Sequence, residues 1–416
     1  MSASIHKGVV TAVVLILVVF QHFQVTALGT YPVTIGLFAG LILLLLGSKR
    51  VSVAALMVTL SIACVPSAIV QIMTPSLRGG ASTFFGTFCL FVLAAVIVAQ
   101  YNGSTVRTSF GTGAVRGVFI ALVTVVLLAV VQVVTGARGS LAWFNLFGEH
   151  QYLYQYNPHL EFNPVPRAAA FYLEPSYAAF IVGSLSVMLI VARRHVKAAW
   201  ILGAVGMLAI RSATGLLIFA LVAAVALIAS RSRWRLIAAV GLVLAGLVAV
   251  PYLSGRLDST FTTGSSAYYR LIGPLQVLRD TLYNFPLGHP FGSLRDTVAD
   301  YGILNGAAAG DSLDNGFYVF VFYFGWIGLL GCLALVVWVA RRVVLAQRRA
   351  SPGGALVAVW VVGSLFFSGG VMLPEFVLTL WLLFAVHHSS AARELPDGQV
   401  GMNDALVDRH DNLQRR

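Results

Sequence analysis

The first acidic residue of this chain is Glu149, and the residues before it are apolar apart from a few Lys, Arg and His. The whole chain of 416 residues is 58% hydrophobic and only 10% charged, which is too little charge to cover a soluble domain. Apolar runs of about 17–25 residues, the length that a helix needs to cross a hydrocarbon core of about 30 Å, recur throughout. The sequence therefore predicts an all-α polytopic integral membrane protein.

We expect about twelve transmembrane helices from these runs. The runs are Val9 to Ala27, Pro32 to Leu46, Val51 to Met73, Thr83 to Gln100, Val115 to Thr135, Ala168 to Ala192, Ala198 to Ile210, Gly215 to Ser230, Leu236 to Leu253, Gly316 to Ala340, Ala355 to Val371 and Phe376 to His388.

Lys and Arg mark the cytoplasmic side of such helices, because cationic loops resist translocation. Alternate links between the predicted helices carry these cations: Lys49 with Arg50, Arg107 with Arg116, Arg193 with Arg194 and Lys197, Arg231 with Arg233 and Arg235, and Arg341 with Arg342, Arg348 and Arg349. The pattern predicts that both termini are cytoplasmic. It also attributes most of the net charge of +12 to membrane topology, so no nucleic acid partner is expected.

The predicted domains are a transmembrane domain over residues 1–388, with outward loops at 136–167 and 254–315, and a cytoplasmic tail over residues 389–416. The larger loop lies between the ninth and tenth predicted helices. A long loop on one face of a bundle is more often a binding element than a spacer. Within it, Pro274 to Tyr283 is predicted to be a helix with Leu275, Leu278 and Leu282 on one apolar stripe.

Two ionisable residues fall at membrane depth. The apolar run before Arg211 has only 13 residues and spans about 20 Å, so Arg211 is predicted to lie below the outer surface. Glu174 lies within the sixth predicted helix, which the following Pro175 is expected to interrupt. Charged groups at such depth usually face a watery cavity or an opposite charge, which makes both residues functional candidates. The structural alternatives are that Arg211 extends to the surface, or that Glu174 pairs with Arg167 or Arg211.

The larger outward loop offers further candidates. Arg270 and Arg279 are possible anion ligands, but nine residues apart on one helix they would point in opposite directions. Arg270 is favoured, because Arg279 has acidic neighbours such as Asp280 as surface partners. His289 is a candidate general acid or base by its intrinsic pKa, with a plain turn residue as the alternative. Asp314 is a candidate at the start of a helix, where an Asp often only caps the helix.

Taken in order, these residues and their neighbours resemble the O-antigen ligase and Wzy-type O-antigen polymerase superfamily of bacterial envelope glycosyltransferases. Each motif is short, and their order on one membrane face carries the resemblance. The motifs are Arg167 followed by Glu174-Pro175, the turn Arg211 to Gly215, Arg270 followed by Pro286-Leu287-Gly288, Asp314 to Phe317, and Phe324 to Gly328.

The resemblance implies an enzyme of the bacterial inner membrane that joins glycans carried on undecaprenyl pyrophosphate to an acceptor sugar on the periplasmic side. It implies no cofactor, no nucleotide donor and no metal. Outward-facing arginines hold the pyrophosphate in this superfamily. By this match they are Arg211 and Arg270, with Arg167 and Arg279 as further candidates. A planar guanidinium suits phosphate oxygens and stays charged when it is desolvated.

Two departures from the superfamily pattern bear on function. Ligases carry a His where this chain has Asp314, which favours a polymerase, and a common Gly is replaced by Ala168, Ala169 and Ala170. The predicted activity is polymerisation of lipid-linked repeat units into a surface polysaccharide, with Glu174 or Asp314 accepting the proton. The alternatives are a ligase that transfers the glycan to lipid A core or protein, and a flippase or transporter. Donor glycan, acceptor glycan, the bilayer and a chain-length regulator are the candidate partners.

Overall fold

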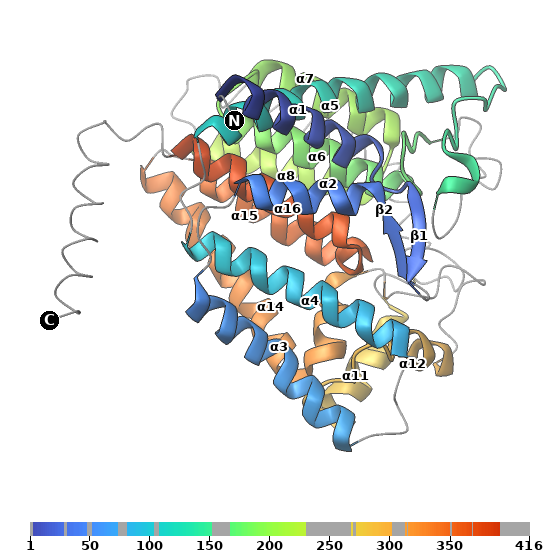
Figure 1. Ribbon diagram of the computed structural model, residues 1–416, viewed down its shortest axis with the longest axis vertical. Helices are drawn as coiled ribbons and strands as arrows, with labels where there is room; N and C mark the ends of the chain where they lie inside the picture. Colours follow the sequence, from blue (N-terminus) through green and yellow to red (C-terminus); the bar gives the residue numbers. More distant parts are fainter. Residues whose placement is uncertain are drawn as a thin grey trace, which may run out of the picture.

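The computed structural model describes residues 3–28, 31–47, 52–73, 81–103, 108–151, 167–229, 268, 272–301, 313, 315–349, 352–367 and 369–391. These residues are nearly all helical, with one two-stranded antiparallel sheet (Figure 1). In chain order the elements are α1 (Ala3–Val19), β1 (Gln24–Leu28), β2 (Tyr31–Thr34), α2 (Ile35–Gly47), α3 (Val53–Met73), α4 (Ala81–Gly103), α5 (Thr108–Gly136), η2 (Gly148–His150), α6 (Pro175–Val191), α7 (Val196–Ile210), α8 (Ala213–Ala229), α11 (Pro274–Asn284), α12 (Leu294–Asp300), α14 (Gly316–Arg349), α15 (Gly353–Phe367), η5 (Gly369–Met372) and α16 (Pro374–Ala391).

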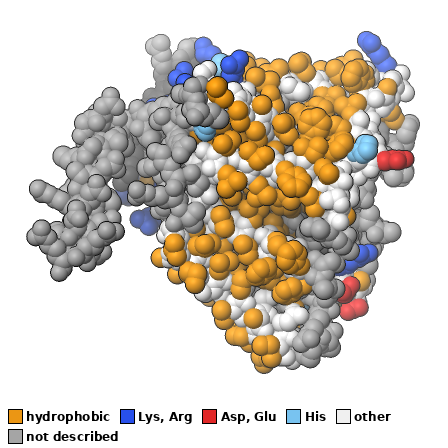
Figure 2. Space-filling view, viewed as in Figure 1, with side chains coloured by type: hydrophobic (Ala, Val, Ile, Leu, Met, Phe, Trp, Pro, Cys, Tyr) orange, Lys and Arg blue, Asp and Glu red, His pale blue; other side chains and the backbone are white. Residues whose placement is uncertain are grey.

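The helices have the composition of a membrane bundle. Among the described residues, α3, α4, α5 and α14 are long and apolar enough to cross a membrane, and several apolar helices are shorter. Figure 2 shows hydrophobic side chains over most of the visible face and charged side chains toward its edges. The predicted all-α membrane class is confirmed. The count of twelve spans stays a prediction, and the run Leu236 to Leu253 lies outside the described residues.

Two predicted spans have a different shape in the structure. The first helix ends at Val19, and the chain then forms the β1–β2 hairpin, in which Ala27 pairs with Pro32 and Leu28 with Tyr31. The sixth helix begins at Pro175 rather than at Ala168, so the expectation that Pro175 interrupts a helix is wrong. Proline fits the first helical turn because its missing N–H has no helical acceptor there.

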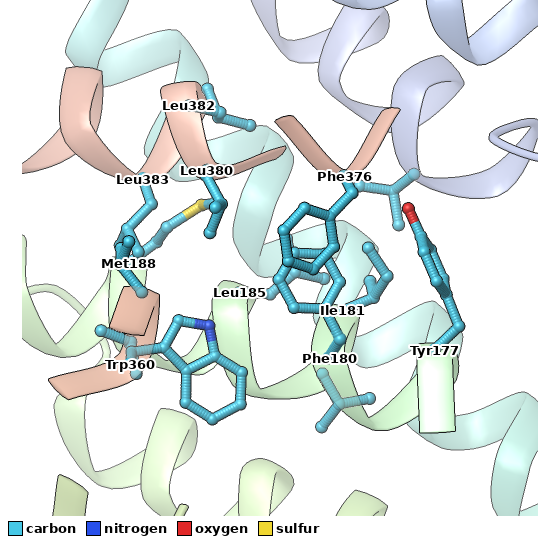
Figure 3. Packing of buried hydrophobic residues seen from close by; sticks show 14 of the residues in the cluster. Tyr177, Phe180, Ile181, Leu185, Met188, Trp360, Phe376, Leu380, Leu382 and Leu383 are labelled. Atoms are coloured by element: carbon cyan, nitrogen blue, oxygen red, sulfur yellow. The ribbon is translucent and has the colours of Figure 1, made fainter. Parts of the chain in front are cut away.

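Helix α6 lies at the centre of the bundle, in contact with α5, α7, α8, α15 and α16 (Figure 1). All but one of its residues are buried, as expected for a helix that is apolar on every side. Figure 3 shows Phe180 of this helix against Phe376 of α16, with ring centroids 4.2 Å apart. A hydrogen bond of 2.9 Å from Trp360 Nε1 to Ser184 Oγ joins α6 to α15. These contacts with neighbouring helices therefore fix the positions of the residues at both ends of α6.

Candidate functional site

Arg211 occupies the turn between α7 and α8. It caps α7, with its N–H donating to the Met207 carbonyl at 2.9 Å, and its side chain is half-buried. Its backbone has φ 52°, the left-handed region in which a non-glycine residue costs about 1–2 kcal/mol. Glycine is the usual residue at such a helix end, whereas this chain places an arginine side chain there.

Ser212 and Gly215 explain the rest of this turn motif. The Gly215 N–H donates to Ser212 Oγ at 3.4 Å, and Ser212 Oγ lies 3.2 Å from Thr214 Oγ1, so the serine caps the start of α8. A Cβ on Gly215 would lie 2.4 Å from the Ala179 Cβ of α6. The motif thus packs the start of α8 against α6, beside Arg211.

The segment that carries Arg167 lies beside the end of α7. The Ala168 N–H donates to the Ala209 carbonyl at 3.4 Å, which brings the backbone next to Arg167 close to that next to Arg211. Arg167 itself is half-buried. The structure therefore joins these two arginine-bearing segments at one end of the bundle.

Gln132 of α5 holds the alanines that replace the superfamily's glycine. Its Oε1 accepts the N–H groups of Ala169 and Ala170 at 3.0 and 2.8 Å, and its Nε2 donates to the Ala170 carbonyl at 3.0 Å. Ala170 has φ 51°, a conformation that glycine adopts at no steric cost. Ala170 thus has the backbone conformation that a glycine would favour, and Gln132 holds it there.

Glu174 lies at the same end of the bundle, as the residue before α6. Its side chain is half-buried and accepts a hydrogen bond from Ser176 Oγ. The Leu173 N–H donates to His22 Nδ1 at 3.2 Å, so the end of α1 holds the backbone just before Glu174. Because α6 and α7 run antiparallel, Glu174 and Arg211 fall on the same side, opposite Arg193.

The Pro-Leu-Gly and Phe-Gly-Trp motifs pack against each other. Helix α14 breaks at Gly325, which has φ 53° and ψ −128°, and the Trp326 N–H donates to the Pro286 carbonyl at 3.0 Å. The Phe322 carbonyl, the acceptor that Trp326 would use in an unbroken helix, instead accepts the His289 N–H at 2.8 Å. The turn after α11 thus replaces one helical hydrogen bond with two.

His289 is buried within this contact. Its Nε2 lies 3.1 Å from Thr281 Oγ1, and its ring stacks on Phe322 with centroids 4.2 Å apart. Burial lowers the pKa of His289 to about 4, so the ring is neutral at physiological pH. These contacts favour the turn-residue alternative, and a role in proton transfer stays a prediction.

Helix α11 confirms the predicted helix at Pro274. Its buried residues are Pro274, Val277 and Thr281. Of the predicted apolar stripe, Leu278 packs against the core and Leu282 is half-buried, whereas Leu275 is exposed. Arg279 is exposed, and the neighbouring Asp280 accepts hydrogen bonds from Tyr301 and Asn284.

Arg270 and Asp314 lie outside the described residues. Their neighbour Asn315 is buried, and its Oδ1 accepts the Phe317 N–H at 2.9 Å, as a helix cap does. The capping role that the sequence offered to Asp314 is therefore filled by Asn315.

Residues 9–389 match the sequence pattern of the WcaD colanic acid polymerase family. The match covers most of the chain and every candidate residue. The chain belongs to this family. It is also similar to the protein of Escherichia coli (strain K12) named "Putative colanic acid polymerase", with 28% identity over 384 residues, which are 86% of this chain and 92% of the relative. The superfamily resemblance drawn from short motifs is confirmed.

The structure adds residues at this end of the family's bundle that the sequence did not point out. Gln132 is one, and Glu375 in the first turn of α16 is another. Glu375 is buried and lies in Leu373-Pro374-Glu375, which resembles Leu173-Glu174-Pro175 at the start of α6. That second pairing of Glu with Pro at the start of a helix was the available signal.

Proposed function

We propose that this protein polymerises lipid-linked oligosaccharide repeat units into an exopolysaccharide at the periplasmic face of the bacterial inner membrane. The donor is a growing glycan on undecaprenyl pyrophosphate, and the acceptor is the next lipid-linked repeat unit. The observation that carries this proposal is the half-buried Arg211, held in a left-handed conformation at the end of the bundle that also bears Arg167 and Glu174, in a chain of the colanic acid polymerase family.

The arginines are proposed to bind the pyrophosphate of the donor. Arg211 and Arg270 supply the main contacts, and Arg167 is a further ligand because its segment is hydrogen-bonded to the end of α7. A guanidinium donates two parallel hydrogen bonds to phosphate oxygens, and its charge stabilises the leaving pyrophosphate. We give Arg279 a minor role because it is exposed on α11.

The transfer needs a group that accepts a proton. The acceptor hydroxyl attacks the anomeric carbon of the donor, the bond to undecaprenyl pyrophosphate breaks, and a carboxylate takes the hydroxyl proton. Glu174 and Asp314 are the two proposed acceptors. Asn315 caps α14, so the reason for treating Asp314 as a simple cap is weaker. No metal or nucleotide donor takes part in the proposed reaction.

Incubation of the purified protein with a lipid-linked repeat unit tests this function. The expected product is a ladder of longer lipid-linked glycans on a gel. Transfer of a single glycan to lipid A core without a ladder would instead indicate a ligase. Movement of the unextended lipid-linked glycan across a vesicle membrane would indicate a flippase.

Two substitutions in the outward loop sharpen the test. Arg270→Lys should remove most of the ladder, because an ammonium group cannot donate two parallel hydrogen bonds, while Arg279→Lys is the matched control. Asp314→Asn should slow extension by roughly 100-fold if Asp314 is the base. A full ladder from Asp314→Asn would leave Glu174 as the proposed proton acceptor.

A further inference from the structure

A buried polar cluster lies where the end of α1, the end of β2, α6 and α16 meet. Its members are Gln21, Thr34, Tyr177, Glu375 and Thr379, and all five are buried. The proposed reaction uses none of them. Polar groups are costly to bury without partners, so the hydrogen bonds of this cluster indicate what it does.

Glu375 connects three of these elements. Thr34 Oγ1 accepts the Leu37 N–H at 3.0 Å as the cap of α2, so its own proton is donated to Glu375 Oε1. Gln21 Nε2 donates to the Glu375 carbonyl at 3.3 Å and to Thr379 Oγ1 at 3.0 Å. The residues after Thr34 hold the turn that follows α1, because the Ile35 and Gly36 N–H groups donate to the Phe23 and Phe20 carbonyls at 3.0 and 3.1 Å. The first turn of α16 therefore holds both the hairpin and the turn after α1.

Three buried oxygens in the cluster have no hydrogen-bond partner in the described part of the chain: Glu375 Oε2, Gln21 Oε1 and Tyr177 Oη. The Tyr177 ring packs on the ring of His22, with centroids 4.5 Å apart, and Figure 3 shows the Tyr177 hydroxyl turned toward Phe376 at the start of α16. An ionised Glu375 would leave a buried negative oxygen, Oε2, without a donor, which is costly. A proton on Oε2 removes that charge.

The cluster borders Glu174 on both sides. His22, next to Gln21, accepts the Leu173 N–H at 3.2 Å, immediately before Glu174. Tyr177 lies in the first turn of α6, immediately after Glu174. Any change that releases the cluster would therefore loosen the backbone that carries Glu174.

We infer that Glu375 is a positioning residue of the polymerase, which stays protonated and, through Thr34 and the turn after α1, holds Glu174 in place for the reaction. The inference rests on the proposed function. An ionised carboxylate buried here would need a cation, and among the described residues no cation contacts Glu375. A neutral carboxyl still accepts from Thr34 and adds no buried charge.

Glu375→Gln and Glu375→Leu separate this role from others. The amide of Gln copies a neutral carboxyl, so Glu375→Gln should keep kcat within about twofold of the wild type. Leu cannot accept the Thr34 hydrogen bond, so Glu375→Leu should lower kcat at least about tenfold and change the KM for the repeat unit less than about threefold, because orientation is lost rather than binding.

Gln100→Leu is the matched control. Gln100 Oε1 accepts Trp381 Nε1 at 2.9 Å, so this variant also removes a buried side-chain hydrogen bond between α16 and another helix, away from Glu174. Its melting temperature should fall as in Glu375→Leu, whereas its kcat per folded molecule should stay at the wild-type value.

Three results would overturn the inference: Glu375→Gln as slow as Glu375→Leu, wild-type kcat from Glu375→Leu, or an equal loss of kcat from Gln100→Leu. If Glu375→Leu does not accumulate in membranes, Thr34→Val, which removes the donor to Glu375, decides, with a lower kcat at unchanged KM expected and wild-type kcat contradicting. A wild-type protein that does not extend the repeat unit would remove the proposed function itself, before any variant is compared.

Discussion

The two ends of the α6–α7 pair have the same backbone conformation and opposite surroundings. The turn between α6 and α7 contains Arg193 and His195 at φ 53°, and the opposite end of the pair contains Ala170 and Arg211 at φ 51° and 52°. Arg193 and His195 are exposed, whereas Arg211 is half-buried and lies at the end that bears Glu174. Left-handed backbone alone therefore does not mark a functional site.

The difference lies in how each cation is surrounded. The cations of the turn between α6 and α7 are exposed, at the end of the pair that the charge pattern predicts to be cytoplasmic. Arg211 is instead half-buried at the end that bears Arg167 and Glu174, an arrangement that suits a side chain with a ligand. The following predictions test this contrast, beginning with the largest effect.

Cysteine labelling tests whether the two ends lie on opposite sides of the membrane. In a protein whose Cys64, Cys89 and Cys332 have been replaced, a cysteine at Arg138 should react fully with a membrane-impermeant thiol reagent added to the periplasm. A cysteine at Arg194 should not react. Both positions are exposed, so access within the fold does not limit the reaction. Reaction of both positions from the same side would end the comparison.

Arg211→Lys should lower polymer formation by roughly 100-fold, because the lysine keeps the charge but loses the bidentate contact with the leaving pyrophosphate. Arg193→Lys is the matched control, with the same backbone conformation at the other end, and should make normal polymer. Polymer length on a gel and protein amount by immunoblot, in a strain lacking the native copy, give the measurement. Near-normal polymer from Arg211→Lys would remove that residue from the site.

Buried His289 should make the stability of the protein sensitive to acid. The pKa of His289 is about 4 in the folded protein, below the value of about 6.5 expected when unfolded, so the unfolded state binds more protons at low pH. This contribution to stability is complete above pH of about 6.5 and is lost as the pH falls toward 4, by about 3 kcal/mol in all.

The melting temperature in detergent, followed from neutral to acidic pH, measures this effect. His289→Gln should flatten the acid dependence, although it lowers stability at neutral pH, because the stacked ring is lost. His195→Gln should keep the wild-type dependence. Equal dependence in both variants would show that another group causes the loss in acid.

The smallest expected effect concerns the left-handed backbone itself. Ala170→Gly and Arg193→Gly should each raise stability by about 0.5–1 kcal/mol, because glycine adopts this conformation without strain. Ala204→Gly, at an exposed position within α7, should instead cost about 1 kcal/mol. Arg211→Gly should be stabilising and inactive. An active Arg211→Gly would mean that the arginine is kept for some reason other than catalysis.

Much of this protein follows from its sequence. Apolar length and the absence of acids before Glu149 indicate a membrane bundle, because a bilayer accepts only backbones that satisfy their own hydrogen bonds. The short apolar run before Arg211 predicts a position below the outer surface, which stays a prediction. The ordered motifs predicted the superfamily that the colanic acid polymerase match confirmed.

Only the tertiary structure decided which residues those motifs meet. Three contacts join residues that are far apart in the chain. The Pro286 turn bonds to the broken helix near Gly325, Gln132 bonds to Ala170, and Thr34 bonds to the buried Glu375. The local sequence determines the length of a helix and which of its ends carries charged residues, because these depend on nearby residues. It does not encode which backbone groups a distant side chain will satisfy, because that depends on how the helices pack.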